Sequence, residues 1–185
     1  MNAWYIKQAV RALRHGGVIA YPTEAVWGLG CDPWDRKAVM RLLTIKQRAV
    51  EKGLILVAAD ISQLGPLGQN LSESERSLIS SSGDIPTTWL IPDPDMIIPN
   101  WIKGIHKDVA IRVSTHSGVK SLCKSYGGML VSTSANRSGD EAAHSLWQVR
   151  CALGQDIDYI LPGKLGGCAR PSEIRALRGG NILRS

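Results

Sequence analysis

A run of hydroxyl side chains stands at the end of an apolar segment in residues 130–139, LVSTSANRSG. The apolar pair predicts a buried strand, and four polar residues follow it before a turn: Ser132, Thr133, Ser134 and Asn136. Because successive side chains of a strand point to opposite faces, at least two of the hydroxyls would share one face. Hydroxyls and turn amides can form an anion-binding concavity without a Walker loop. The same residue types also cap ordinary turns, so this stretch alone leaves both interpretations open.

Two basic residues stand at the end of a second segment, LLTIKQR, residues 42–48. Lys46 lies four residues after Leu42 and seven after Val39, so helical spacing places it on the core-facing side of a predicted helix. There it either points into a polar cavity or extends to solvent at the helix C-terminus, where the helix dipole favours a cation. Arg48 adds a planar guanidinium to this point charge, a combination that suits phosphate oxygens.

The third segment with candidate chemistry is YPTEAVWGLG, residues 21–30. A strand would deliver Thr23 and Glu24, and Gly28 and Gly30 would allow a close approach of the backbone. The segment is neither a G-x-G-x-x-G nor a Walker A loop, because the third glycine and the G-K-[ST] are missing. An ordinary glycine turn is the alternative interpretation.

Composition limits the class of protein. A chain of 185 residues with 44% hydrophobic residues suits one globular domain, and no apolar run approaches the length of a membrane span or a secretory signal. We therefore expect a single domain over 1–185 in the cytoplasm, with no membrane contact. The net charge of +6 suits an anionic partner such as a nucleotide or RNA.

The sequence has no metal-ligand spacing and no G-x-S-x-G motif of a serine hydrolase. We expect its four cysteines to be buried, reduced thiols: Cys31, Cys123, Cys151 and Cys168.

The segments that must position these residues alternate between helical and extended patterns. Helical spacing predicts helices over 3–15, from Asp32 or Asp35 to about 48, within 72–82, and over 117–126 and 144–153. Short β-branched or apolar runs predict strands at 18–21, 54–59, 87–92, 108–113, 129–133, 158–161 and about 180–184. The continuous apolar run LILVAA (54–59) is typical of a strand covered on both faces. This mixture predicts one α/β domain with an open, twisted mixed sheet.

Taken together, the segments resemble the YrdC/TsaC family of threonylcarbamoyl-AMP synthases. YPTEAVWGLG is similar to that family's P-T-[ED]-[TA]-V-[YF]-G-[LV]-G opening, KQR to its K-x-R element and STSAN to its S-x-N element. PGKLGGCARPSEI (162–174) resembles its late P-G…P-S-[TE]-I segment. The similarity extends from about residue 5 to Arg184, and the motifs occur together in the same order.

The resemblance implies a YrdC-like sheet around a positively charged cavity, and a nucleotidyltransferase reaction. ATP, L-threonine and bicarbonate would give L-threonylcarbamoyl-AMP and pyrophosphate, with Mg²⁺ on the triphosphate. The product would serve the N6-threonylcarbamoyladenosine modification of tRNA, through a separate transferase complex and with possible tRNA binding.

The motif matches also imply roles for individual residues. The phosphates and the displacement chemistry would involve Lys46 and Arg48. The nucleotide would further contact Ser132, Ser134, Asn136 and Arg184. The threonine pocket would contain Thr23, Arg112 and Ser172, with Arg112 pairing the amino-acid carboxylate.

The chain departs from the family pattern in a few places. Residues 82–88, SGDIPTT, stand where the family has W-P-G-P-[VL]-T. Ala49 and Ser117 each stand where the family has a proline, and Ala176 stands where it has an aspartate. These departures would affect the rate and the local rigidity more than the type of reaction.

Two other functions stay open at this point. One is a paralogue of the same fold with another carbamoyl or adenylate substrate, and the other is a non-catalytic RNA-binding module in RNA or ribosome maturation.

Overall fold

The computed structural model describes residues 2–81, 85–170, 172–179 and 181–184, except for the side chain of Arg184. Helices and 3₁₀ turns alternate with strands along the chain. The helices are α1 (Ala3–Arg14), α2 (Arg36–Lys46), α3 (Pro66–Gln69), α4 (Glu73–Ser80), α5 (Asn100–Lys103), α6 (Ser117–Tyr126) and α7 (Leu146–Leu153), and the 3₁₀ turns are η1 (Val50–Lys52) and η2 (Ile61–Leu64). Among the described residues, no helix has the length and apolar character needed to cross a membrane.

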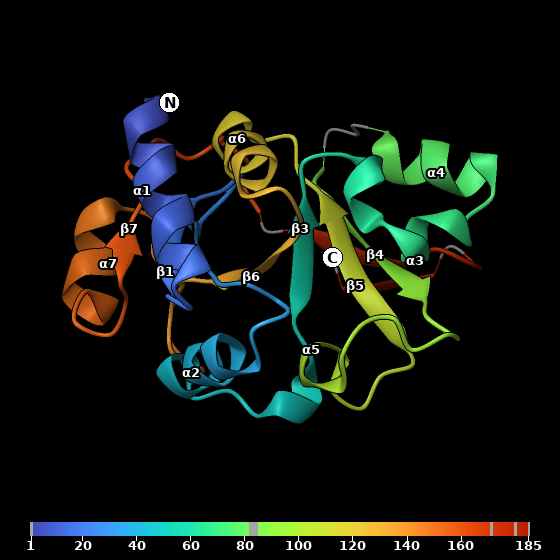
Figure 1. Cartoon of the computed structure of the whole chain (residues 1–185), viewed down its shortest axis with the longest axis horizontal. Coiled ribbons are helices and arrows are strands. Elements are labelled where there is room, and N and C mark those ends of the chain that lie inside the picture. The colour runs from blue at the N-terminus through green and yellow to red at the C-terminus, as the bar shows by residue number, and fades with distance from the viewer. Residues whose placement is uncertain (1, 82–84, 171, 180, 185) are drawn as a thin grey trace.

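The strands form one mixed sheet of open outline (Figure 1). They are β1 (Ile19–Pro22), β2 (Trp27–Gly30), β3 (Ile55–Ala58), β4 (Thr87–Pro92), β5 (Asp108–Val113), β6 (Leu130–Ser134), β7 (Tyr159–Ile160), β8 (Glu173–Ala176) and β9 (Ile182–Arg184). Their order across the sheet is β7-β1-β2-β6-β3-β5-β4-β8-β9, with parallel pairs β1–β7, β3–β5 and β4–β8 and antiparallel pairs elsewhere. The expected α/β class with an open mixed sheet is confirmed.

Apolar side chains cover both faces of the sheet. On one face α1 and α6 lie side by side (Figure 1) and pack against Ile19, Val57 and Leu130. On the other face the apolar sides of α2, α5 and α7 pack against Leu56, Ala58 and their neighbours. The alternation of Leu56 and Val57 between the two clusters follows from the period of two in a strand. It confirms that the 54–59 segment is covered on both sides.

Strand β2 was not expected, because its glycines suggested a loop. Trp27–Gly30 instead pairs with β1 on one side and β6 on the other. A β-carbon on Gly30 would lie 2.4 Å from the carbonyl oxygen of Val131 and 2.8 Å from the Tyr21 ring. The glycine therefore permits the close backbone approach that its position suggested, but toward neighbouring residues of this chain. Strand β8 and the short helices α3 and α5 were also missed.

The expectation of four buried thiols is confirmed for two of the cysteines and wrong for the other two. Cys31 and Cys123 are buried, whereas Cys168 is half-buried and Cys151 is exposed. In α7 the buried residues are Val149 and Leu153, one helical turn apart. Cys151 stands midway between them in sequence and therefore lies on the outer face of the helix.

A buried ion pair fixes the proline-rich loop after β4. The Lys103 ammonium lies 2.7 Å from Oδ2 of Asp93, and the side chains are only 4% and 0% exposed. The same carboxylate accepts hydrogen bonds from the backbone N–H groups of Ile97 and Ile98, at 2.8 and 3.0 Å. Burial would raise the pKa of Asp93, but the hydrogen bonds from Lys103 and these N–H groups outweigh it and lower the pKa, so the carboxylate is ionised at neutral pH.

Replacing Lys103 by alanine should destabilise the protein strongly. Removing one partner of a buried ion pair leaves the other charge uncompensated and typically costs about 3 kcal/mol or more. We expect a fall of that size in the free energy of unfolding, measured by urea denaturation at pH 7. The matched control is Lys107→Ala, because Lys107 is exposed. Equal stability of the two variants would contradict the prediction.

Candidate functional site

A cavity of about 630 Å³ is lined by residues of β2, β3, β4, β5, β6 and β8 and by the loops beside them. This volume lies in the range of pockets that hold small organic ligands. Cationic side chains outnumber carboxylates among the described lining residues. The cations are Arg48, Lys52, Lys103, Lys107, Arg112 and Arg170, and the carboxylates are Glu24, Asp108 and Asp140. The cavity therefore favours an anionic ligand.

The hydroxyls at the end of β6 lie in one wall of this cavity. Ser132, Thr133, Ser134 and Asn136 all line it. Strand β6 is held between β2 and β3, with Ser134 opposite Gly28 and Ser132 opposite Ile55. The Asn136 amide group donates to the carbonyl oxygens of Arg137 and Asp140, at 3.0 and 2.8 Å, which closes the turn after the strand. The sequence left open whether this segment caps a turn or lines a binding concavity. In the structure the Asn136 amide caps the turn, and the serine and threonine residues line the cavity.

Lys46 lies behind that wall, on the buried side of α2 as its spacing predicted. Its ammonium donates to the carbonyl oxygens of Ser134 and Asn136, at 2.5 and 2.9 Å, and to Oδ1 of Asn136 at 3.2 Å. Burial, with a smaller contribution from the positive charge of Arg48, lowers the pKa of Lys46 to about 8. These bonds use all three ammonium hydrogens, and Lys46 is not among the described residues that line the cavity. Direct contact between Lys46 and a phosphate stays a prediction.

Arg48 reaches the cavity just after α2 ends. Gln47 adopts a left-handed conformation with φ of 51°, which stops the helix and turns the chain. The Arg48 guanidinium then donates from Nε and Nη2 to the carbonyl oxygen of Gly53, at 3.2 and 2.8 Å. These bonds hold its planar group in the cavity wall, where it could meet an anion.

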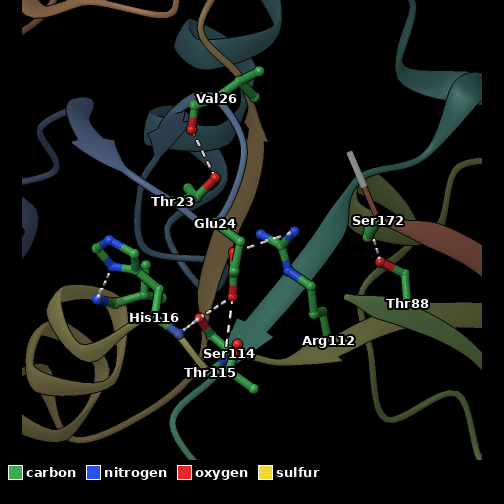
Figure 2. Close-up of polar contacts among 10 residues, drawn as sticks. Thr23, Glu24, Val26, Thr88, Arg112, Ser114, Thr115, His116 and Ser172 are labelled. Atoms are coloured by element: carbon green, nitrogen blue, oxygen red, sulfur yellow. Dashed lines mark hydrogen bonds and ion pairs between the residues drawn. The ribbon is translucent and has the colours of Figure 1, made fainter. Parts of the chain in front are cut away.

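The turn between β1 and β2 carries Thr23 and Glu24 into the same cavity (Figure 2). The Thr23 hydroxyl donates to the carbonyl oxygen of Val26 at 2.7 Å, so it is left as an acceptor toward a ligand. Oε1 of Glu24 accepts from the Ser114 hydroxyl at 2.5 Å and from the Thr115 N–H at 3.2 Å. The sequence placed both residues at a strand end, and the structure adds the partners that immobilise Glu24.

Arg112 and Ser172 complete the predicted threonine pocket. In Figure 2 the guanidinium of Arg112, from β5, lies beside the Glu24 carboxylate, with Nη1 and Oε2 3.6 Å apart. Ser172, just before β8, shares a 2.8 Å hydrogen bond with the buried hydroxyl of Thr88. Both Arg112 and Ser172 line the cavity, as does Thr23.

The structure thus brings eight of the nine predicted residues together around one cavity, seven in its lining and Lys46 directly behind it. The ninth is Arg184, whose side chain lies outside the described part of the chain.

The family of the chain follows from its match to a family model. A model for Sua5, YciO and YrdC proteins, described as telomere recombination, matches residues 11–185. The chain belongs to the Sua5/YciO/YrdC family. The match covers every predicted site residue, and it confirms the family that the motifs indicated.

Curated relatives cover the chain over nearly its whole length. A protein of Pseudomonas fluorescens (strain Pf0-1) named threonylcarbamoyl-AMP synthase is 48% identical over 184 residues, which span 100% of this chain and 98% of the relative. A protein of the same name from Chromohalobacter salexigens is 50% identical over 179 residues, 97% of this chain and 96% of the relative.

Solved structures share the fold. P. abyssi Sua5, solved in complex with L-threonine, matches with a TM-score of 0.90 and 28% identity over 100% of this chain. This chain spans about half of that protein, since the match covers 54% of its length. E. coli YciO matches with a TM-score of 0.82 and 23% identity, over 100% of this chain and 90% of YciO.

Sequence reasoning did not predict several residues in the cavity or directly behind its wall. Lys52 and Lys107 bring further positive charge, and Thr88 orients Ser172 from behind. Thr88 keeps the threonine of the divergent 82–88 segment, but no local pattern indicates its partner, which lies 84 residues away. Lys52 stands four residues after Arg48 in a basic segment, a signal that could have marked it. Nothing in the sequence around Lys107 indicates that it faces the same cavity as Ser134.

Proposed function

We propose that this protein is a threonylcarbamoyl-AMP synthase, which converts ATP, L-threonine and bicarbonate into L-threonylcarbamoyl-AMP and pyrophosphate. One observation carries the proposal: the K-x-R and S-x-N residues and the predicted threonine pocket meet at one cationic cavity. Full-length relatives at 48–50% identity that bear this name support it.

The reaction requires positioning and neutralisation of charge. The threonine amine combines with CO₂, formed from bicarbonate by loss of water, to give a carbamate. A carbamate oxygen then attacks the α-phosphorus of ATP, and the bond to the β-phosphate oxygen breaks as pyrophosphate leaves. Phosphoryl and nucleotidyl transfers of this kind depend on held geometry and fixed positive charge. Arg48, with its guanidinium already fixed on Gly53, would meet the phosphates, and Ser132 and Ser134 would contact the adenylate.

Mg²⁺ would enter with the nucleotide. Within the described residues, no group of three or more His, Cys, Asp or Glu side chains is arranged to hold a metal ion. Of the carboxylates in the cavity, Glu24 is committed to Ser114 and Thr115, which leaves Asp108 and Asp140. Mg²⁺ in nucleotide enzymes commonly takes most of its ligands from phosphates and water. The ion would neutralise the triphosphate, and the protein would contribute at most one or two oxygens.

The product would be used to modify tRNA to N6-threonylcarbamoyladenosine. We include in the proposal a cytoplasmic location, transfer of the product to a tRNA threonylcarbamoyl-transferase complex, and tRNA binding by the basic chain. The net charge of +6 is compatible with such a partner.

Pyrophosphate release tests the proposed reaction. Purified protein should release pyrophosphate from ATP and Mg²⁺ only when L-threonine and bicarbonate are both present, and omission of either should abolish the release. Release that does not need threonine would instead indicate a paralogue with another substrate. Folded protein that releases none, but binds RNA with a steep salt dependence, would support the RNA-binding alternative.

A further inference from the structure

We propose that Glu24 is a positioning residue for amino-acid recognition: it holds the Arg112 guanidinium in the cavity wall, with donors left for the substrate carboxylate. This inference rests on the proposed function, and it concerns a residue that the predicted threonine pocket did not include. Figure 2 shows the arrangement, with Glu24 between Arg112 and the Ser114–Thr115 segment.

The Glu24 carboxylate is held in one place. Oε1 accepts from the Ser114 hydroxyl and from the Thr115 N–H. The Ser114 oxygen itself accepts from the His116 N–H at 3.1 Å, so its single hydrogen is directed to Glu24. Ser114 and Thr115 thus hold Oε1 directly, and His116 holds the Ser114 hydroxyl in turn, which fixes the position of the carboxylate. Its second oxygen, Oε2, is thereby presented to Arg112.

The contact between Glu24 and Arg112 is incomplete. Their closest atoms are 3.6 Å apart, although the side chains are only 4% and 11% exposed. Among the described residues, neither Oε2 of Glu24 nor Nε of Arg112 has a hydrogen-bond partner. Buried polar atoms without a partner are rare in folded proteins, and each one calls for an explanation.

The buried pair of Asp93 and Lys103 gives an internal comparison. There the charged atoms are 2.7 Å apart, and two backbone N–H groups also bind the carboxylate. That pair has the close contacts expected of a purely structural role. Lys103 also lines the cavity, but its ammonium is closely paired with Asp93, whereas the charged groups of Glu24 and Arg112 come no closer than 3.6 Å. A guanidinium offers five N–H donors, so a ligand carboxylate could bind Arg112 while Glu24 keeps the group oriented.

The alternative role, a proton acceptor for the threonine ammonium, fits less well. Burial would raise the pKa of Glu24, but the charge of Arg112 and the Ser114 hydrogen bond outweigh it, and the pKa is lowered. A carboxylate with a lowered pKa is a weak base, and Oε2 is buried. Glu24 is therefore suited to remain a fixed anion beside a buried cation, which without it would lack a compensating charge.

A double-mutant cycle tests this role. Glu24→Gln preserves size and removes the charge, and we expect the KM for threonine to rise about tenfold, with the KM for ATP within about twofold of wild type. In an Arg112→Ala background the same change should have almost no further effect, because Glu24 acts through Arg112. A residue that only stabilised the fold would not show this loss of effect. Glu73→Gln, on the exposed start of α4, is the matched control.

Ser114→Ala is a second variant that keeps the charge but removes one of the two hydrogen bonds to Oε1, and it should raise the KM for threonine by a smaller factor, about threefold. Thermal unfolding checks each variant, and Ser114→Ala carries the test if Glu24→Gln does not fold. An unchanged KM for threonine in a folded variant, or an equal effect of Glu24→Gln with and without Arg112, would overturn the proposal. Wild-type protein with no threonine requirement would overturn the proposed function as well, so the two failures are distinguishable.

Discussion

Replacement of Lys46 by alanine should lower kcat/KM for ATP by about 100-fold or more, the usual effect of removing a group that stabilises developing charge. The structure gives a specific reason. The Lys46 ammonium joins the end of α2 to the turn after β6 by three hydrogen bonds to Ser134 and Asn136. Its loss would remove a positive charge behind the proposed phosphate site and release the S-x-N turn.

The control and the pH dependence make the Lys46 prediction specific. Lys37→Ala, in the exposed first turn of the same helix, should keep normal turnover. Because the pKa of Lys46 is lowered to about 8, the ammonium is charged below that pH and loses its proton above it. Affinity for ATP should therefore be constant below pH 8 and fall as pH rises further, measured by calorimetry. The Lys46→Ala variant should lack that fall, and normal turnover in it would contradict a role for Lys46 in the site.

Periodicity predicted the side of α2 on which Lys46 lies, but left open whether its ammonium is buried and could not indicate its bonds. The spacing of Val39, Leu42 and Lys46 depends only on helix geometry, so the core-facing side of α2 could be derived from the sequence. The acceptors of its ammonium belong to residues 88 and 90 positions away, at the exit of β6: two backbone carbonyls and the side-chain oxygen of Asn136. No local pattern encodes which loop meets which helix end. For the same reason, the motif match could assign Lys46 to the phosphates but could not place it behind the cavity wall.

Strand β2 illustrates the same limit within the fold. Gly28 and Gly30 lower the strand propensity of WGLG, and local patterns therefore predicted a loop. The segment is nevertheless a strand, because it pairs with β1 and β6. Strand β6 lies so close that a larger residue at Gly30 would collide with the Val131 carbonyl. Strands with apolar or β-branched runs, such as β4 and β5, were predicted with their observed bounds. The divergent 82–88 segment gives no such comparison, since residues 82–84 lie outside the described part of the structure.

The incomplete pairing of Arg112 leads to a second prediction with a different kinetic signature. Arg112→Ala should raise the KM for threonine by about 30-fold or more, because truncating one partner of a buried charged contact typically costs about 2 kcal/mol or more. The value of kcat at saturating threonine should change much less, since the proposed function assigns Arg112 to the threonine carboxylate and not to the phosphates. Steady-state pyrophosphate release with varied threonine measures both values.

Two further variants separate the shape of the guanidinium from its charge. Arg112→Lys keeps the charge but not the planar fork, so its KM for threonine should lie between those of wild type and Arg112→Ala. Arg150→Ala, on the exposed side of α7, should behave as wild type. An unchanged threonine dependence in folded Arg112→Ala would remove this residue from the pocket. If kcat also fell while the KM for threonine stayed unchanged, Arg112 would instead be assigned to the phosphate end of the site.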